Sequence, residues 1–80
     1  MESRSIAGLG NAAVISPSDT VNLPTVCKAI YVGVTGDVKV DLTQTGTAIV
    51  FKAVPVGILP VQAMRVYSTG TTATNLVALY

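Results

Sequence analysis

The pattern of apolar and polar positions divides this chain near Pro24. From residue 25 onward, short runs of β-branched and apolar residues are separated by turns rich in glycine and threonine. The clearest alternation covers residues 38–43, where Val38, Val40 and Leu42 point to one face of a strand and the polar residues between them to the other. Asp37 and Asp41 are therefore expected in solvent, at the turn before this strand and on its wet face.

Further strands are predicted over residues 25–34, 47–54, 61–67 and 74–80. Residues 35–37 are predicted to form a tight turn in which Gly36 supplies a positive φ where one is needed. Residues 54–60 are apolar but contain Pro55 and Pro60, which favours an extended crossing loop over a central strand, because proline has no N–H for a strand ladder. These elements predict an all-β fold, a small antiparallel sandwich or barrel of about five to six strands.

Residues 1–24 follow a different pattern. They are rich in Ser, Ala, Gly and Asn, and their apolar patches at residues 6–9 and 12–15 hold neither strict alternation nor helical spacing. We predict an extended N-terminal arm over residues 1–24, with a short strand as one option around residues 11–15, followed by a β-domain over residues 25–80. A floppy terminus is the alternative, but the apolar patches favour an arm that docks on another surface.

The composition indicates that part of the surface is covered by other protein chains. Five basic and four acidic residues are the charged residues among 80, the net charge is +1 and half of the residues are apolar, whereas an ordinary globular protein uses roughly a quarter charged residues. Histidine is absent and Cys27 is the one cysteine, so an intrachain disulfide is excluded and a zinc site lacks ligands. Oligomerisation is then the remaining common source of stability for so small a core. Cys27 is expected to be an inert buried thiol.

The same sequence argues against several classes of function. Nucleophilic catalysis lacks a histidine base, and neither the few carboxylates nor the scattered glycines form a catalytic pair or a phosphate-binding loop. We therefore expect no enzyme, no cofactor and no metal site. The basic residues are spread singly, so nucleic-acid binding is not favoured. With no run of 18 apolar residues and no secretory signal, the chain is expected to be made in the cytoplasm and to have no membrane partner.

The order of several motifs carries a family resemblance. The segments are AIYVGVTGDV at residues 29–38, FKAVPVGILPV at 51–61, Arg65-Val66, and TGTTATNLVALY at 69–80. Together they resemble small β-rich virion proteins of tailed bacteriophages and of phage-like gene transfer agents, including those called head spike base proteins. The resemblance covers about residues 25–80.

The resemblance implies a virion protein on the capsid surface, made in the bacterial host cytoplasm. Its role would be that of a head decoration (cement) protein or of a vertex spike base, with the major capsid protein, further copies in a trimer or pentamer, and other spike or cement proteins as partners. A tail-associated structural adaptor and a small nucleic-acid-binding β-barrel are the alternatives. The contact residues expected in the arm and in the proline-bounded loop are Ile6, Leu9, Val14, Ile15, Ile58 and Leu59.

Overall fold

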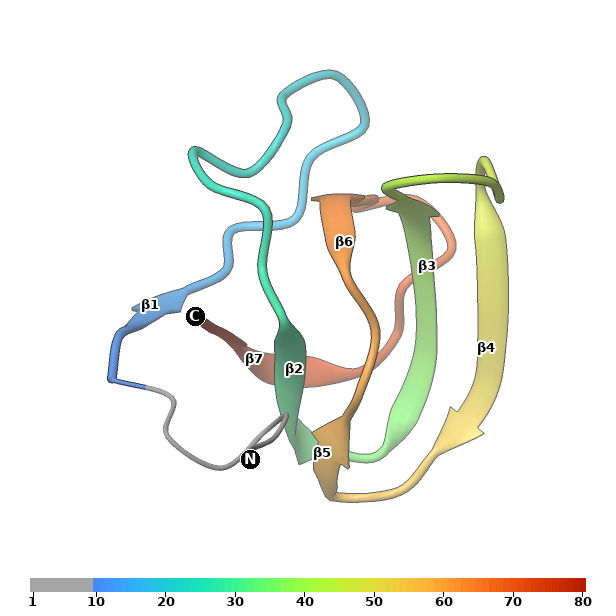
Figure 1. The fold of residues 1–80 in the computed structure, drawn as a ribbon. Coiled ribbons are helices and arrows are strands. Elements are labelled where there is room, and N and C mark those ends of the chain that lie inside the picture. The colour runs from blue at the N-terminus through green and yellow to red at the C-terminus, as the bar shows by residue number, and fades with distance from the viewer. Residues whose placement is uncertain (1–9) are drawn as a thin grey trace.

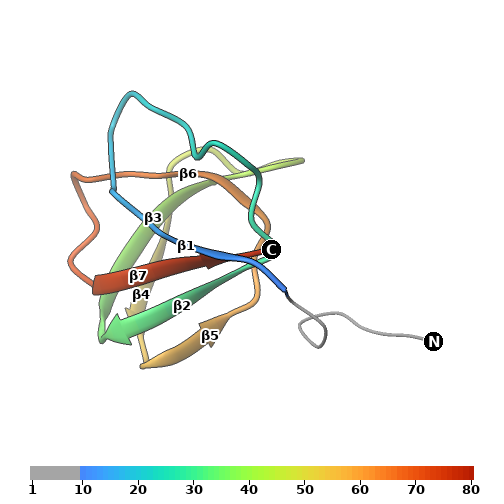
Figure 2. The same cartoon turned by 90° about the vertical axis from the view of Figure 1, so that its left-hand side faces the viewer.

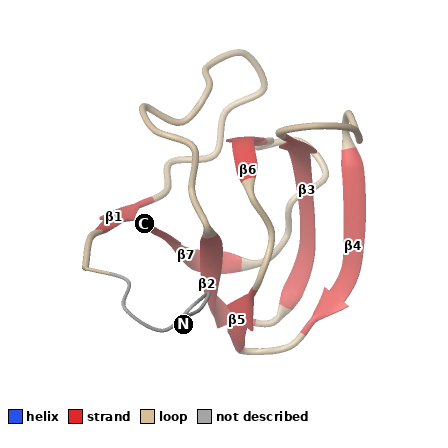
Figure 3. Ribbon diagram, in the orientation of Figure 1, coloured by secondary structure: helices blue, strands red, loops and turns tan. Residues whose placement is uncertain are grey.

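The computed structural model describes residues 10–80, and this part of the chain consists of strands and loops with no helix (Figure 3). The strands in chain order are β1 (Ala12–Val14), β2 (Ala29–Val34), β3 (Gly36–Leu42), β4 (Ile49–Val54), β5 (Gly57–Leu59), β6 (Ala63–Val66) and β7 (Thr74–Leu79). The predicted all-β class is confirmed, with seven strands in place of the expected five to six.

The strands form two antiparallel sheets that pack as a sandwich rather than a closed barrel. Sheet A has the order β1-β7-β2-β5, and sheet B has the order β4-β3-β6. Figure 1 shows the elements in sequence colours, and Figure 2 shows the four strands of sheet A side by side in front of sheet B. Neither sheet is a simple meander, because β7 lies between β1 and β2 in sheet A and β6 pairs with β3 rather than β4 in sheet B.

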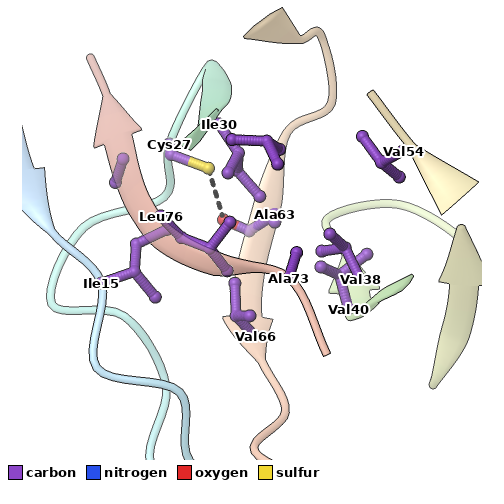
Figure 4. Close-up of a cluster of buried hydrophobic side chains, with 12 residues drawn as sticks. Ile15, Cys27, Ile30, Val38, Val40, Val54, Ala63, Val66, Ala73 and Leu76 are labelled. Atoms are coloured by element: carbon purple, nitrogen blue, oxygen red, sulfur yellow. Dashed lines mark hydrogen bonds between the residues drawn. The ribbon is translucent and has the colours of Figure 1, made fainter. Parts of the chain in front are cut away.

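The core lies between the inner faces of the two sheets (Figure 4). Ile30 and Val32 from β2 belong to the same buried cluster as Val38 and Val40 from β3, and all four side chains are fully buried. Burial of a side chain of this size stabilises the fold by about 1.5–3 kcal/mol relative to leaving it exposed. The alternation predicted for residues 38–43 therefore identified the inner face of β3 correctly at Val38 and Val40.

The turn predicted at residues 35–37 is a corner between the sheets. Strand β2 ends at Val34 in sheet A, and β3 begins at Gly36 in sheet B. This corner needs no positive φ at Gly36, which is not among the described glycines with that conformation. Glycine is required here by space: a Cβ on Gly36 would lie 2.4 Å from the backbone nitrogen of Ala73.

Residues 54–60 cross from sheet B to sheet A, as predicted, but the middle of the segment is a strand and not a loop. Strand β5 pairs with β2 and places Ile58 opposite Tyr31. Because β5 is an edge strand, one of its sides needs no partner, and the flanking prolines Pro55 and Pro60 are tolerated.

The described part of the N-terminal segment lies against the sandwich. Strand β1 falls within the short strand expected at residues 11–15 and pairs with β7. Ile15 follows it and is 6% exposed within the core. Farther along, the Ser18 N–H donates to the Val66 carbonyl at 2.9 Å and the Leu23 N–H to the Met64 carbonyl at 2.8 Å, so residues 18–23 run beside β6.

Candidate docking surface

The outer face of sheet A carries a row of apolar side chains that crosses all four strands. The register places Ile58 of β5 opposite Tyr31 of β2, Tyr31 opposite Val77 of β7, and Val77 opposite Val14 of β1. Residues directly opposite in antiparallel strands project from the same face, so these four side chains form one line, here called the apolar row. Val14 is 81% exposed, Ile58 43% and Tyr31 39%, and Val77 is half-buried.

Charge is concentrated on the other sheet. The four strands of sheet A contain no charged residue. The strands of sheet B carry five of the seven charged residues in the described part of the chain, namely Asp37, Lys39, Asp41, Lys52 and Arg65. The other two, Asp19 and Lys28, are in loops, and Lys28 directly precedes β2. An exposed apolar row on an uncharged sheet is typical of a protein interaction site.

The sequence predicted part of this row. Val14 and Ile58 lie on it together, although they belong to opposite edge strands of the sheet. Ile15 packs in the core, and Leu59 is partly buried against it. Ile6 and Leu9 are outside the described residues.

Tyr31 and Val77 in the row were not predicted as contacts. The residues on either side of Tyr31 in β2 are buried, so it alternates with core positions. That alternation is visible in the sequence, but the residues that neighbour Tyr31 on the adjacent strands are not.

A polar cluster on sheet B surrounds Asp41, which was expected in solvent and is in fact 7% exposed. Its carboxylate accepts hydrogen bonds from the Ala48 N–H at 2.7 Å and from the Tyr67 hydroxyl at 2.9 Å. Lys39 Nζ lies 4.9 Å and Arg65 Cζ 5.7 Å from the centroid of the Tyr67 ring. The bond from Ala48, assisted by Tyr67 and the two cations, lowers the pKa of Asp41. The bond to Asp41 in turn raises the pKa of Tyr67.

A second set of polar contacts holds residues 18–23 beside β6. The Asp19 carboxylate accepts hydrogen bonds from the Thr69 hydroxyl at 2.6 Å, the Thr69 N–H at 2.9 Å and the Ser68 N–H at 3.0 Å. These bonds, first those from Thr69, lower the pKa of Asp19. Arg65 donates through Nε to the Asn22 side-chain oxygen at 2.8 Å. The hydrogen bonds of Asp19 are the part of this attachment that acid can weaken.

The lowered pKa values of Asp19 and Asp41 predict loss of stability in acid. Both values lie below the ordinary 3.8, so the ionised carboxylates stabilise the fold above that pH, and this contribution is lost as the pH falls through 3.8 to the folded-state values. We expect the free energy of unfolding, measured with urea, to fall between about pH 6 and about pH 3 in the wild type, and to fall less in a D19N/D41N double variant. Equal slopes for the two proteins would contradict this assignment.

The described residues offer little for chemistry. Within residues 10–80, no three His, Cys, Asp or Glu side chains are grouped so as to hold a metal ion. Cys27 is fully buried, as predicted, and burial raises the pKa of its thiol. A hollow of about 230 Å³ is lined by Leu42, Thr43, Gln44, Thr45, Val61 and Gln62, none of which is ionisable. The same part of the chain holds no helix with the length and apolar character needed to cross a membrane.

Comparison with known proteins identifies a similar solved structure. No family model matches the chain, and no curated protein matches it. The chain is similar to a chain in a solved structure described as "Capsid of native GTA particle computed with C5 symmetry", where GTA denotes a gene transfer agent. The TM-score is 0.82 and the sequence identity 30%, over 98% of this chain and 92% of the other. The protein therefore belongs to the same family as that chain of the gene transfer agent capsid.

Proposed function

We propose that this protein is a non-enzymatic structural component of a phage-like particle, which binds the capsid exterior as a decoration protein or vertex spike base and stabilises the head. The observation that carries this proposal is the apolar row on the uncharged face of sheet A. The family relationship to a chain of a gene transfer agent capsid supports two parts of this proposal, namely that the protein belongs to a phage-like particle and that it is located at the capsid. The major capsid protein is the proposed partner of the row.

The distribution of charge gives the proposed orientation. Sheet A faces the shell, since removing its uncharged strands from water leaves no charge without a partner. Sheet B, with five charged residues on its strands, faces the solvent. A charged outer surface keeps a decorated particle dispersed.

The size of the row requires many copies to act together. Its exposed side chains are those of Val14, Tyr31 and Ile58, with Val77 half-buried between them. A specific interface normally buries at least about 1,000 Å², and four side chains supply a fraction of that area. We therefore propose that copies bind as a homo-oligomer, in which linked sites raise the effective concentration of each. The related capsid structure, computed with C5 symmetry, supports a symmetric assembly of copies, either a trimer or a pentamer.

Two isoleucine-to-lysine variants test the proposed face. Ile58 on sheet A and Ile49 on sheet B are 43% and 39% exposed, so a lysine at either position alters the folded surface to a similar extent. We expect I58K to weaken binding to undecorated capsids at least about tenfold, because a charge is driven into an apolar contact. I49K is expected to bind as the wild type does. Co-sedimentation measures the binding of both variants to undecorated capsids, which are purified from particles made without the gene for this protein.

The outcomes separate the proposal from its alternatives. Loss of binding in I49K but not in I58K would place the contact on sheet B and contradict the orientation. Wild-type protein that sediments with isolated tails and not with heads would contradict capsid binding and support a tail-associated adaptor.

A further inference from the structure

The four sheet edges differ in how they are protected against pairing with another strand. Strand β4 carries Lys52 and a register shift near Ala53, whose φ is 52°. Strand β5 lies between Pro55 and Pro60. Strand β6 is covered by residues 18–23. Charges, bulges, prolines and covering loops are the usual means by which proteins close sheet edges.

Within residues 10–80, strand β1 has none of these devices. Its three residues are all exposed, and residues 10–15 contain neither a charge nor a proline. Asn11 and Ile15 form backbone hydrogen bonds at 2.9 and 3.0 Å with β7 or the residue that follows it. Because backbone groups alternate sides along a strand, Ala12 and Val14 direct their N–H and C=O groups away from β7. The free edge thus offers two donors and two acceptors.

This edge continues the apolar row. Val14 is both the last member of the row and a residue whose backbone groups face outward. A partner that lies over the row therefore meets the β1 edge in the plane of the same sheet. A strand added at β1 would place one more side chain beside Val14 and lengthen the row across a fifth strand.

We propose that an extended, uncharged segment of the capsid shell protein adds to β1 as a fifth strand of sheet A. The inference rests on the proposed function, because it names how the chain attaches to the shell. The lack of charge in residues 10–15 selects an uncharged segment, since a buried charge opposite β1 would find no counter-charge there. The small side chains of Ala12 and Ala13 leave room for the added strand.

A proline at position 12 tests the proposal. Ala12→Pro removes an outward N–H, whereas the matched control Ala12→Ser keeps it and alters the surface little. We expect A12P to bind undecorated capsids about tenfold more weakly, the effect of one lost hydrogen bond with its unsatisfied partner. A12S is expected to bind as the wild type does. Both should keep a Tm within about 5 °C of the wild type, because the removed group makes no bond to β7.

Hydrogen exchange provides a second measurement that does not depend on the variant folding. The amides of Ala12 and Val14 are expected to exchange rapidly in the free wild-type protein and to become protected on capsids. Wild-type binding by A12P, or unprotected amides on the capsid, would overturn strand addition while leaving capsid attachment intact. Failure of the wild type to bind capsids would instead overturn the proposed function. Protection of both amides in a free dimer would show that the strand comes from a second copy and not from the shell.

Discussion

The Ile30→Ala variant is expected to lose about 2–5 kcal/mol of unfolding free energy, the usual effect of truncating a fully buried isoleucine. Ile30 lies in β2, one of the two central strands of sheet A, and its side chain is completely inaccessible to solvent. A core of this size rarely supplies more than about 3–5 kcal/mol of net stability. The variant is therefore expected to be largely unfolded at 25 °C in the absence of its partners.

The exposed isoleucine of the neighbouring strand is the control. Ile58 lies in β5, beside β2, but on the outer face of sheet A. Ile58→Ala removes the same atoms and is expected to cost less than about 1 kcal/mol, because that side chain remains 43% exposed and its loss leaves no cavity in the core. Urea denaturation followed by circular dichroism measures both variants. Similar losses for the two would mean that the core is not where the sandwich places it.

A methyl group at position 36 is expected to be almost as damaging. The Cβ of Gly36→Ala would meet the backbone of Ala73 and Thr72 at 2.4 to 2.8 Å. Backbone cannot rotate away as a flexible side chain can, and the Thr72 and Ala73 N–H groups are both held by the Asp37 carbonyl. We expect a loss of about 3 kcal/mol, at the upper end of the range for overpacking.

Gly10 provides the comparison for this variant. A Cβ at Gly10 has no neighbour within 4 Å, so Gly10→Ala is expected to change stability by less than about 0.5 kcal/mol. Thermal unfolding of the two variants beside the wild type measures the difference. A Gly36→Ala protein as stable as the Gly10→Ala protein would contradict the close approach of residues 36 and 73.

Local alternation was sufficient to predict most of the strands, although β5 was expected as a loop, but it did not predict which strands are neighbours. Val38 and Val40 were assigned to the buried face from a period of two, and that assignment is confirmed. The same period cannot say that β2 pairs with β7 and not with β3, because a sharp turn in sequence serves equally as a hairpin or as a corner between sheets. The requirement for glycine at position 36 comes from the backbone of Ala73, which leaves no room for a Cβ there and is distant in the sequence.

Long-range contacts also explain what was missed at the polar cluster and the docking surface. Asp41 was expected in solvent from its place in the strand, but its hydroxyl donor, Tyr67, is 26 residues away. Val14 and Ile58 were expected as contacts because each is apolar in a weakly patterned segment. The strand order joins them through Tyr31 and Val77, and pairing across four strands cannot be read from any one of them.

The central position of β7 has a consequence for synthesis of the protein. Strand β7 is the last of the seven to be translated, yet it separates β1 from β2 and pairs with both. A nascent chain that ends before Thr74 therefore has no means of joining the first strand to the second, and contacts of such long range form late in folding. The apolar row is complete only once β7 has been translated, because Val77 lies in that strand. A chain truncated before Thr74 is therefore expected to lack the apolar row.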